Sequence, residues 1–560
     1  MNSTRSVRAR LQRVLWHPLT LALVLAVAVR VLPATWNYVI GTDEALYLTL
    51  GGHFAAGDGF TADGIHPHSE FDPGYPLFAA VMYRLTDTIP FSPTITANDV
   101  WKLELPARLN ILLLGSLLVV PVYSLARNFL PASAEEGKQL AARAARLTAV
   151  VPALALGVPN LEAASEQLYS LALWSGWLFL WLGLTRRRAL WFLLGGMAFG
   201  IAHLTRYEGA ISAGVAILIT LVWFFPQWRA ARNLSVLRYA VLIAALLGGF
   251  LFLAAPYALY QTARTGSVFS TKSIVHQLHG EALASSDPYA WEKAYDNYER
   301  VRDNPGLYPP LPVYLWQHRE QTVSLYARNT VGQLVLLLTS PTFLFLLWLP
   351  LAVIGALKFT RAQNLFLAAT LFPMLVFPLS VIDGRYLLPL LPAGMLWAAR
   401  GLGAADDWLR PRVNSWLERL RITRVYPNFA RRYTLTLCIS ALFVLADLIA
   451  IFFIPRPTEY RTAGLALRGT ITPQAPVLMR KRQIAFYANA AYESIPFSDL
   501  QGVLDYAKQK GAEYFVIDAR TTPATRPQLV YLLDTPVVKP LEIAYESTSG
   551  PKVIVYHIVK

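Results

Sequence analysis

The chain has 560 residues, of which 55% are hydrophobic and only 15% are charged, and its mean hydropathy is +0.39. A soluble protein of this length needs more charge to cover its surface, so the composition excludes an ordinary soluble enzyme. The formal net charge of +15 raises the possibility of a nucleic-acid partner. Because the basic residues cluster between apolar blocks, we expect no nucleic acid and interpret the charge as a signal of membrane orientation.

The basic clusters fall in residues 5–13, 186–188 and 410–432. If the N-terminus is cytoplasmic, all three clusters lie on the cytoplasmic side, as the positive-inside rule requires. The single cysteine, Cys438, falls in the last apolar block and excludes a disulfide framework and a cysteine-based metal site.

The first apolar block, residues 15–29, has the length of a signal peptide. We favour an uncleaved anchor, because apolar residues resume after Arg30 and continue to Ile40. Arg30 is costly in lipid and is expected to face a polar interior.

About 20 apolar residues of helix cross a membrane, and on this basis we predict about 11 transmembrane helices. The predicted spans are 15–40, 105–126, 147–159, 167–184, 190–204, 210–225, 237–259, 330–357, 363–381, 386–403 and 435–454. They form a membrane domain over residues 1–455, with two long outer loops at 41–103 and 261–328. The cytoplasmic loop before the third span contains Arg143 and Arg146.

Residues 456–560 have a different pattern and are expected on the extracytoplasmic side. Leu500–Lys510 has helical periodicity, while residues 514–518, 541–545 and 553–558 are typical of strands. The chain is therefore predicted to be an α-helical polytopic membrane protein with a small C-terminal α/β extracytoplasmic domain.

The strongest candidate for chemistry is the pair Asp43-Glu44, directly after the first span. An aspartate there is suited to take a proton from a hydroxyl or to bind a metal. The alternative is helix capping, in which Thr42 or Asp43 is the N-cap and the helix dipole favours both acids.

The same outer loop contains His66, His68 and Asp72, followed by Pro73-Gly74. Two histidines at this spacing are a weak metal signal, and solvated loop residues are the alternative for each. No clear metal ligand set is present, so we assign no metal and no cofactor and leave a divalent cation open.

Two arginines lie at outer ends of spans, against the positive-inside bias: Arg206 in the segment Leu-Thr-Arg-Tyr-Glu-Gly and Arg385 in the segment Asp-Gly-Arg-Tyr-Leu-Leu-Pro. An arginine at headgroup depth is suited to bind a phosphate. The alternative is snorkelling or an ion pair, of Arg385 with Asp383 or of Arg206 with Glu208. Weaker signals are Glu162 and Glu166, before the fourth span.

Together these segments resemble the GT-C glycosyltransferases, in particular the branch of protein O-mannosyltransferases and the lipid A aminoarabinose transferase. The resemblance covers roughly residues 15–400. It rests on the Asp-Glu pair, Pro-Gly-Tyr-Pro at 73–76, Ser-Glu-Gln-Leu-Tyr at 165–169 and the two arginine segments.

The resemblance implies an enzyme that takes a sugar from a polyprenyl-phosphate-linked donor. The acceptor is a lipid, a glycan or a protein, and the anomeric centre is inverted. Asp43 is then the general base, and Glu44 orients Asp43 or the acceptor. Arg385 and Arg206 neutralise the departing phosphate.

The remaining residues that the resemblance places at the substrate are His66, His68, Tyr386, Glu166 and Asp72. Asp72-Pro73 stands where the aminoarabinose transferase has a lysine-proline element, so the phosphate partner in this loop is open. The multi-pass protein is expected in the plasma membrane among membrane lipids.

Two other classes fit parts of the sequence. A polytopic transporter or lipid flippase explains the spans, but transporters concentrate polar residues near the bilayer midplane, whereas the ionisable residues here lie at outer ends of spans. An assembly or sensory protein needs far fewer spans for anchoring. The glycosyltransferase hypothesis is therefore preferred.

Overall fold

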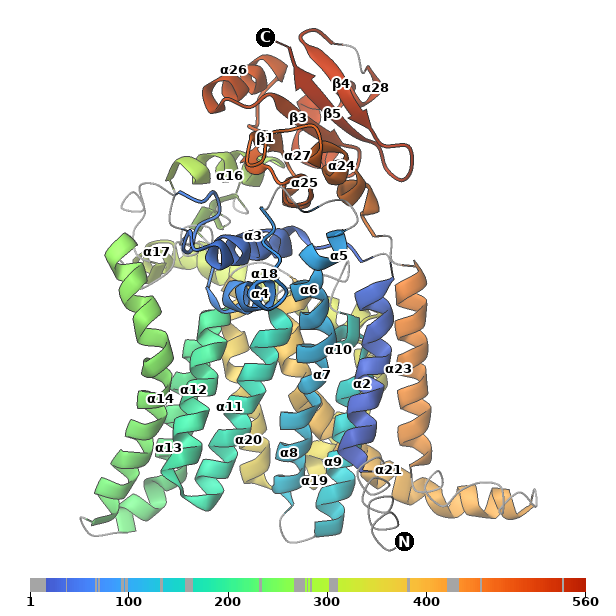
Figure 1. Cartoon of the computed structure of the whole chain (residues 1–560). Helices are drawn as coiled ribbons and strands as arrows, with labels where there is room; N and C mark the ends of the chain where they lie inside the picture. Colours follow the sequence, from blue (N-terminus) through green and yellow to red (C-terminus); the bar gives the residue numbers. More distant parts are fainter. Residues whose placement is uncertain are drawn as a thin grey trace, which may run out of the picture.

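The protein is described here from a computed structural model. It covers residues 17–36, 38–65, 68, 71–91, 95, 99–130, 134–156, 165–230, 234–265, 277–278, 280–282, 285–301, 311–379, 383–419, 433–453, 456–535 and 538–559. These residues form a helical bundle with a small sheet at one end, which we call the sheet end; the opposite end is the far end (Figure 1).

Eight stretches of the described residues are long and apolar enough to cross a membrane. They are Pro18–Thr35, Leu105–Phe129, Glu166–Arg186, Glu208–Phe225, Leu237–Ala263, Arg361–Leu379, Gly384–Trp416 and Thr434–Phe453. Two shorter apolar helices, Ala189–Thr205 and Phe345–Lys358, accompany them. The polytopic helical class is confirmed, but length and composition identify eight spans where the sequence predicted about 11.

The helices of the bundle have bounds close to those predicted for most spans. They are α2 (Pro18–Thr35), α6 (Leu105–Leu109), η2 (Asn110–Leu114), α7 (Gly115–Leu117), α8 (Val119–Phe129), α9 (Ala134–Val150), α10 (Pro152–Leu156), α11 (Glu166–Arg186), α12 (Ala189–Thr205), α13 (Glu208–Ala230), α14 (Leu234–Thr265), α19 (Phe345–Lys358), α20 (Arg361–Leu371), η4 (Phe372–Leu379), η5 (Gly384–Leu390), α21 (Leu391–Arg419) and α23 (Thr434–Phe453).

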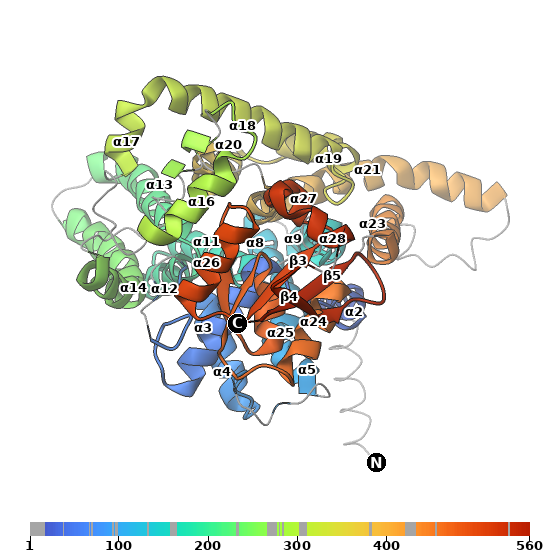
Figure 2. The ribbon, with the colours of Figure 1, turned by 90° about the horizontal axis from the view of Figure 1, so that it is seen from above.

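Two span predictions were wrong. The predicted span 147–159 is interrupted, because α9 ends at Val150 and α10 begins at Pro152. Since α9 begins at Ala134, Arg143 and Arg146 lie in this helix and not in a loop. Residues 330–357 are split between α18 (Arg319–Thr339) and α19. Seen from above, α18 runs along one edge of the bundle, from α17 to α19 (Figure 2).

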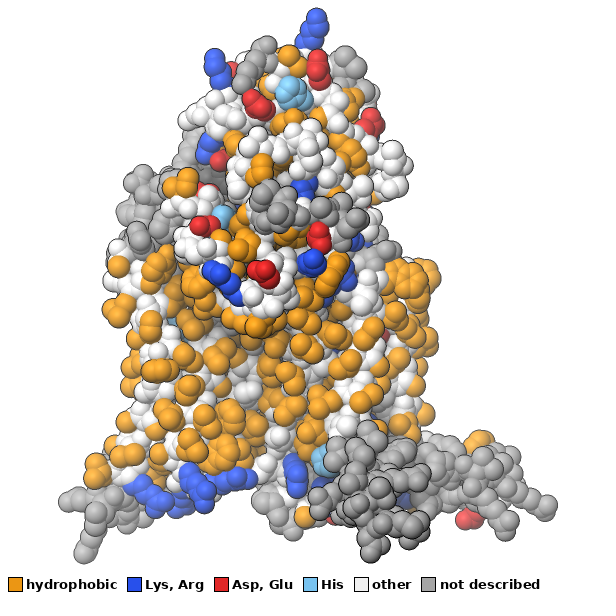
Figure 3. All heavy atoms as spheres, in the orientation of Figure 1, with side chains coloured by type: hydrophobic (Ala, Val, Ile, Leu, Met, Phe, Trp, Pro, Cys, Tyr) orange, Lys and Arg blue, Asp and Glu red, His pale blue; other side chains and the backbone are white. Residues whose placement is uncertain are grey.

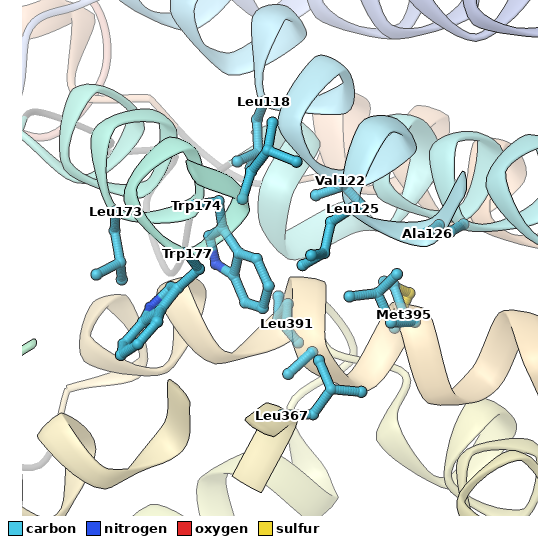
Figure 4. Packing of buried hydrophobic residues seen from close by; sticks show 14 of the residues in the cluster. Leu118, Val122, Leu125, Ala126, Leu173, Trp174, Trp177, Leu367, Leu391 and Met395 are labelled. Atoms are coloured by element: carbon cyan, nitrogen blue, oxygen red, sulfur yellow. The ribbon is translucent and has the colours of Figure 1, made fainter. Parts of the chain in front are cut away.

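The centre of the bundle is packed by side chains from four helices. Figure 4 shows Trp174 and Trp177 of α11 in one cluster with Leu118 and Val122 at the N-cap and in the first turn of α8, and with Leu367 of α20 and Leu391 of α21. Both tryptophans are buried. Lipid tails are as apolar as these side chains, so close van der Waals packing holds the helices together.

Arg30 is fully buried within α2, as its position in an apolar span required. Its guanidinium donates to the carbonyl oxygens of Ala26 (3.0 Å), Ala149 (2.9 Å) and Leu154 (2.8 Å). Ala149 lies in the last turn of α9 and Leu154 lies in α10. The arginine therefore joins the two helices across the break between them, with donors of its guanidinium paired to backbone carbonyls.

The sheet end carries further helices and the sheet itself. The helices outside the sheet unit are α3 (Thr42–Ala56), α4 (Gly74–Leu85), α5 (Val100–Leu103), α16 (Ala290–Val301), α17 (Leu311–Gln317) and α18. The C-terminal unit comprises α24 (Thr458–Arg468), β1 (Pro476–Met479), α25 (Arg482–Ala488), β2 (Ala491–Ser494), α26 (Leu500–Lys510), β3 (Tyr514–Asp518), α27 (Thr522–Thr525), η6 (Pro527–Leu529), α28 (Tyr531–Asp534), β4 (Leu541–Glu546) and β5 (Val553–Ile558).

The strands of the C-terminal unit form one sheet in the order β2-β1-β3-β5-β4. β1 pairs in parallel with β2 and β3, while β5 pairs antiparallel with β3 and β4. Separate apolar clusters include Val516 and Val555 on one face and Phe515 and Tyr556 on the other. The small α/β unit predicted at the C-terminus is confirmed.

Charge separates the two ends of the bundle. Figure 3 shows lysine and arginine side chains gathered along the lower edge, below a broad hydrophobic belt. At the far end, Arg186 closes α11 and Arg187 caps it in a left-handed conformation with φ 53°. This distribution is the basis for the membrane orientation proposed below.

Candidate active site

Helix α3 lies across the sheet end of the bundle, between the bundle and the C-terminal unit (Figure 1). Its first turn contains Thr42, Asp43 and Glu44. Acids are favoured there because the first backbone N–H groups of a helix are unpaired and carry positive partial charge. The two adjacent acids nevertheless have different surroundings.

Glu44 is buried and its carboxylate is engaged locally. It accepts hydrogen bonds from the Gly41 N–H (3.2 Å), the Tyr38 hydroxyl (2.7 Å) and the Tyr75 hydroxyl (3.1 Å). Burial raises the pKa of both tyrosines, and the nearby Glu44 carboxylate raises it further, so both remain neutral donors. Glu44 thus fixes the start of α3. The N-cap is Gly41, so the alternative in which Thr42 or Asp43 is the N-cap was wrong, although both acids do lie in the first turn.

Asp43 is 43% exposed and points to a different partner. Its Oδ2 accepts a hydrogen bond from Nη1 of Arg385 at 3.1 Å. The Nε of Arg385 donates to Oδ2 of Asp383 at 2.9 Å. Among the described residues, Nη2 of Arg385 makes no hydrogen bond or ion pair, and the side chain is 19% exposed.

The short helix η5 holds Arg385 in place. The Asp383 side chain caps it by accepting the Arg385 N–H at 2.9 Å, and the Trp174 indole donates to the Pro389 carbonyl at 2.9 Å. The ion pair of Arg385 with Asp383 that the sequence offered as an alternative is therefore present. It leaves room for the second partner, Asp43.

Arg206 sits in the turn between α12 and α13 and is enclosed by two glutamates. Its Nη1 donates to Glu166 at 2.9 Å and its Nη2 to Glu208 at 3.4 Å. The side chains of Arg206, Glu166 and Glu208 are only 11%, 4% and 1% exposed. The glutamates are the first residues of α11 and α13, where helix dipoles favour acids.

The two arginine clusters adjoin. Tyr386 follows Arg385 in η5, and its ring centre lies 4.9 Å from the guanidinium carbon of Arg206. Tyr47, one turn after Asp43, is buried, and its hydroxyl oxygen accepts a hydrogen bond from the side chain of Ser165, beside Glu166. Burial raises the pKa of Tyr47, and Arg206 nearby lowers it. Tyr386 and Tyr47 thus join both clusters into one polar layer above the apolar bundle.

Glycines in two of the sequence segments allow close helix approach. A Cβ on Gly74 would lie 2.6 Å from the Thr205 hydroxyl, and a Cβ on Gly209 would lie 2.2 Å from the His203 nitrogen. These contacts bring α4 and α13 against the end of α12. The Pro-Gly-Tyr-Pro and Arg-Tyr-Glu-Gly segments therefore allow close packing around Arg206.

The loop residues predicted beside the site have separate places. His68 is buried; its Nε2 accepts the Phe71 N–H at 3.2 Å, and its ring stacks on Phe71. Asp72 is buried near Tyr207, whose pKa is raised by burial, then by Glu208 and, more weakly, by Asp72. His66 and Glu162 lie outside the described residues.

Sequence inspection did not select Tyr47 as a site residue and treated Glu208 only as an ion-pair partner. Their positions in the sequence could have identified them, because Tyr47 is one helical turn after Asp43 and Glu208 follows Arg206 by two residues. Within the described parts of the chain, no group of three histidine, cysteine, aspartate or glutamate side chains is arranged to hold a metal ion.

Comparison with solved structures identifies the fold. ArnT from Cupriavidus metallidurans, bound to undecaprenyl phosphate, matches with a TM-score of 0.58 and 15% identity over 96% of this chain and 97% of that chain. The archaeal oligosaccharyltransferase AglB from Archaeoglobus fulgidus, in complex with an inhibitory peptide and a dolichol-phosphate, matches with a TM-score of 0.55 and 15% identity. That match covers 90% of this chain and 69% of the other.

No protein-family model matches the chain, and no curated protein matches it by sequence. Both solved neighbours are GT-C superfamily members, so the fold expected from the sequence resemblance is confirmed. At 15% identity the likeness establishes the fold alone.

Proposed function

We propose that the chain is a membrane glycosyltransferase that moves a sugar from a polyprenyl-phosphate carrier to an acceptor hydroxyl on the extracytoplasmic face. One observation carries this proposal: the exposed Asp43 carboxylate contacts the partly exposed Arg385 at the sheet end. A carboxylate suited to remove a proton and a guanidinium suited to bind phosphate lie next to each other. The GT-C fold and neighbours solved with undecaprenyl phosphate and dolichol-phosphate support it.

In the proposed reaction the acceptor hydroxyl loses its proton to Asp43 as its oxygen bonds to the anomeric carbon. The bond from that carbon to the phosphate oxygen breaks, and polyprenyl phosphate leaves. Attack from the face opposite the phosphate inverts the anomeric centre. Glu44 fixes the start of α3 and so the place of Asp43, through Gly41, Tyr38 and Tyr75.

Charge in the polar layer gives donor binding a second effect. Asp43, Asp383, Glu166 and Glu208 face two arginines, so carboxylates outnumber guanidiniums. A phosphate that binds Nη2 of the partly exposed Arg385 competes with Asp43 for the same cation. Donor binding would therefore release Asp43 from Arg385 when the base is needed.

The proposed orientation places the sheet end and the C-terminal unit outside the cell and the N-terminus in the cytoplasm. The far end, with Arg186 and Arg187, then faces the cytoplasm. The proposed location is the plasma membrane, where the lipid tail of the donor lies beside the spans. The proposed acceptor is a lipid, a glycan or a protein.

The competing function is that of a polytopic transporter or lipid flippase, which moves the lipid-linked sugar without cleaving it. Membranes from cells that produce the protein supply both donor and acceptor. Mass spectrometry of extracted lipids should show one polyprenyl-phosphate sugar consumed and an equal amount of polyprenyl phosphate formed. Movement of intact donor between leaflets without release of polyprenyl phosphate would contradict the proposal and favour the transporter.

A further inference from the structure

The C-terminal unit contacts the segment leading into α3 through helix α25. The Ile40 N–H donates to the hydroxyl of Tyr487 at 3.3 Å, from a residue 447 positions later in the chain. The Thr42 hydroxyl donates to the side-chain oxygen of Gln483 at 3.3 Å. Both bonds fall within three residues of Asp43. The place of the proposed base thus depends on side chains of the C-terminal unit.

Tyr487 is held firmly enough to transmit such a constraint. It is fully buried, and its hydroxyl donates to Oε1 of Glu104 at 2.6 Å while accepting the Ile40 N–H. Its ring lies in the same apolar cluster as Ile40 and Ala45. Both hydrogen-bonding capacities of the hydroxyl are used in an environment where an unpaired polar group is costly.

Glu104 is fully buried and extends this network in two directions. Its Oε2 accepts Arg108 Nη2 at 2.5 Å, and its Oε1 lies 3.4 Å from Nε of Arg461 in α24. The Arg108 guanidinium lies 4.9 Å from the ring centre of Tyr38, whose hydroxyl donates to Glu44. A second path thus runs from the C-terminal unit to the first turn of α3.

We infer that Tyr487 is a positioning residue for Asp43 and that the C-terminal unit is part of the active-site support. This inference rests on the proposed function. Loss of the hydroxyl leaves the buried Ile40 N–H without its partner and removes one donor from Glu104. The chain entering α3 then shifts, and a small displacement of a reacting group lowers the rate far more than it lowers substrate binding.

The test compares Tyr487→Phe with a matched control, Tyr460→Phe. Both tyrosines belong to the C-terminal unit, and each substitution removes one buried hydroxyl that donates to a carboxylate. The acceptor is Glu104 for Tyr487 and Asp518 for Tyr460. Only Tyr487 touches the segment before α3. Tyr487→Phe should lower kcat about tenfold while the KM for the lipid-linked donor changes less than about twofold. Tyr460→Phe should keep the wild-type kcat.

A second measurement separates positioning from damage to the fold. In an Asp43→Asn background, Tyr487→Phe should cause no further loss of the residual rate, because there is no carboxylate left to position. A further loss there, or equal kcat values for the two tyrosine variants, would overturn the inference.

If Tyr487→Phe does not fold, Gln483→Leu tests the second contact of α25 with the start of α3, the hydrogen bond from Thr42. It should lower kcat about threefold by the loss of one hydrogen bond, and an unchanged kcat would overturn the inference. Full activity of folded Asp43→Asn would instead refute the proposed base, whatever the tyrosine variants show.

Discussion

Arg206 and Arg385 lie in one polar layer, yet their surroundings differ. Arg206 has each terminal nitrogen on a buried glutamate and a tyrosine ring against its face. Arg385 is held by two partly exposed aspartates, one of them Asp43. A buried cation between two acids is a structural element, whereas a partly exposed cation beside an exposed acid is available to a ligand. We therefore expect Arg385 to bind the donor phosphate and Arg206 to hold the layer together.

The largest expected effect is loss of Arg206. Arg206→Gln leaves Glu166 and Glu208 buried without their cation, which should cost about 3–5 kcal/mol of stability. Thermal unfolding of the purified protein should show a clearly lower melting temperature. Adding Glu208→Gln to Arg206→Gln should recover part of it. An unchanged melting temperature together with lost donor binding would reverse the roles of the two arginines.

The next effect is on activity alone. Arg385→Gln should lower kcat/KM about a hundredfold, because a hydrogen bond to a charged group contributes about 1.5–3 kcal/mol. The melting temperature should stay near that of the wild type, since Arg385 is partly exposed. Arg385→Lys keeps the charge without the guanidinium fork and should recover only part of the rate. Normal transfer by Arg385→Gln would exclude Arg385 as the phosphate ligand.

The smallest effect concerns the ring between the arginines. Tyr386→Leu removes the face against Arg206 and the stacking on Phe377, whose ring centre lies 4.8 Å away. A cation–π contact of this kind contributes about 1 kcal/mol, so the free energy of unfolding should fall by about that amount and the melting temperature should fall slightly. Tyr386→Phe keeps the ring and serves as the control. Equal losses in both variants would show that the hydroxyl, not the ring, matters.

Much of the fold follows from local sequence pattern. Helix α26 and strands β3 and β5 have the predicted bounds, because each combines clear periodicity with nearby turn residues. Strands β1 and β2 were not predicted, since four residues are too few to show alternation.

The break inside the predicted span 330–357 does have a sequence signal. Thr339-Ser340-Pro341-Thr342 interrupts the apolar run, and the chain turns there before Leu344 adopts a positive φ of 45°. Hydropathy averaged over the whole run conceals this short polar segment, and a proline restricts the residue before it to non-helical conformations.

The sequence also indicated which residue types belong to the site, but not their pairing. Asp43 and Arg385 were both candidates, yet their contact joins positions 342 residues apart. Such a contact depends on how α3 lies across the bundle. The roles predicted for Glu44, Asp72 and His68 remain predictions, although all three side chains are buried.

The most direct test of the account is sugar transfer by Asp43→Asn in membranes that contain donor and acceptor. Mass spectrometry of the polyprenyl-phosphate sugars measures consumption, and the melting temperature checks folding. We predict that the wild type consumes one donor species and that folded Asp43→Asn keeps only a residual rate, about a hundredfold or more below that of the wild type. Donor consumption at the wild-type rate by folded Asp43→Asn would show that Asp43 is not the base.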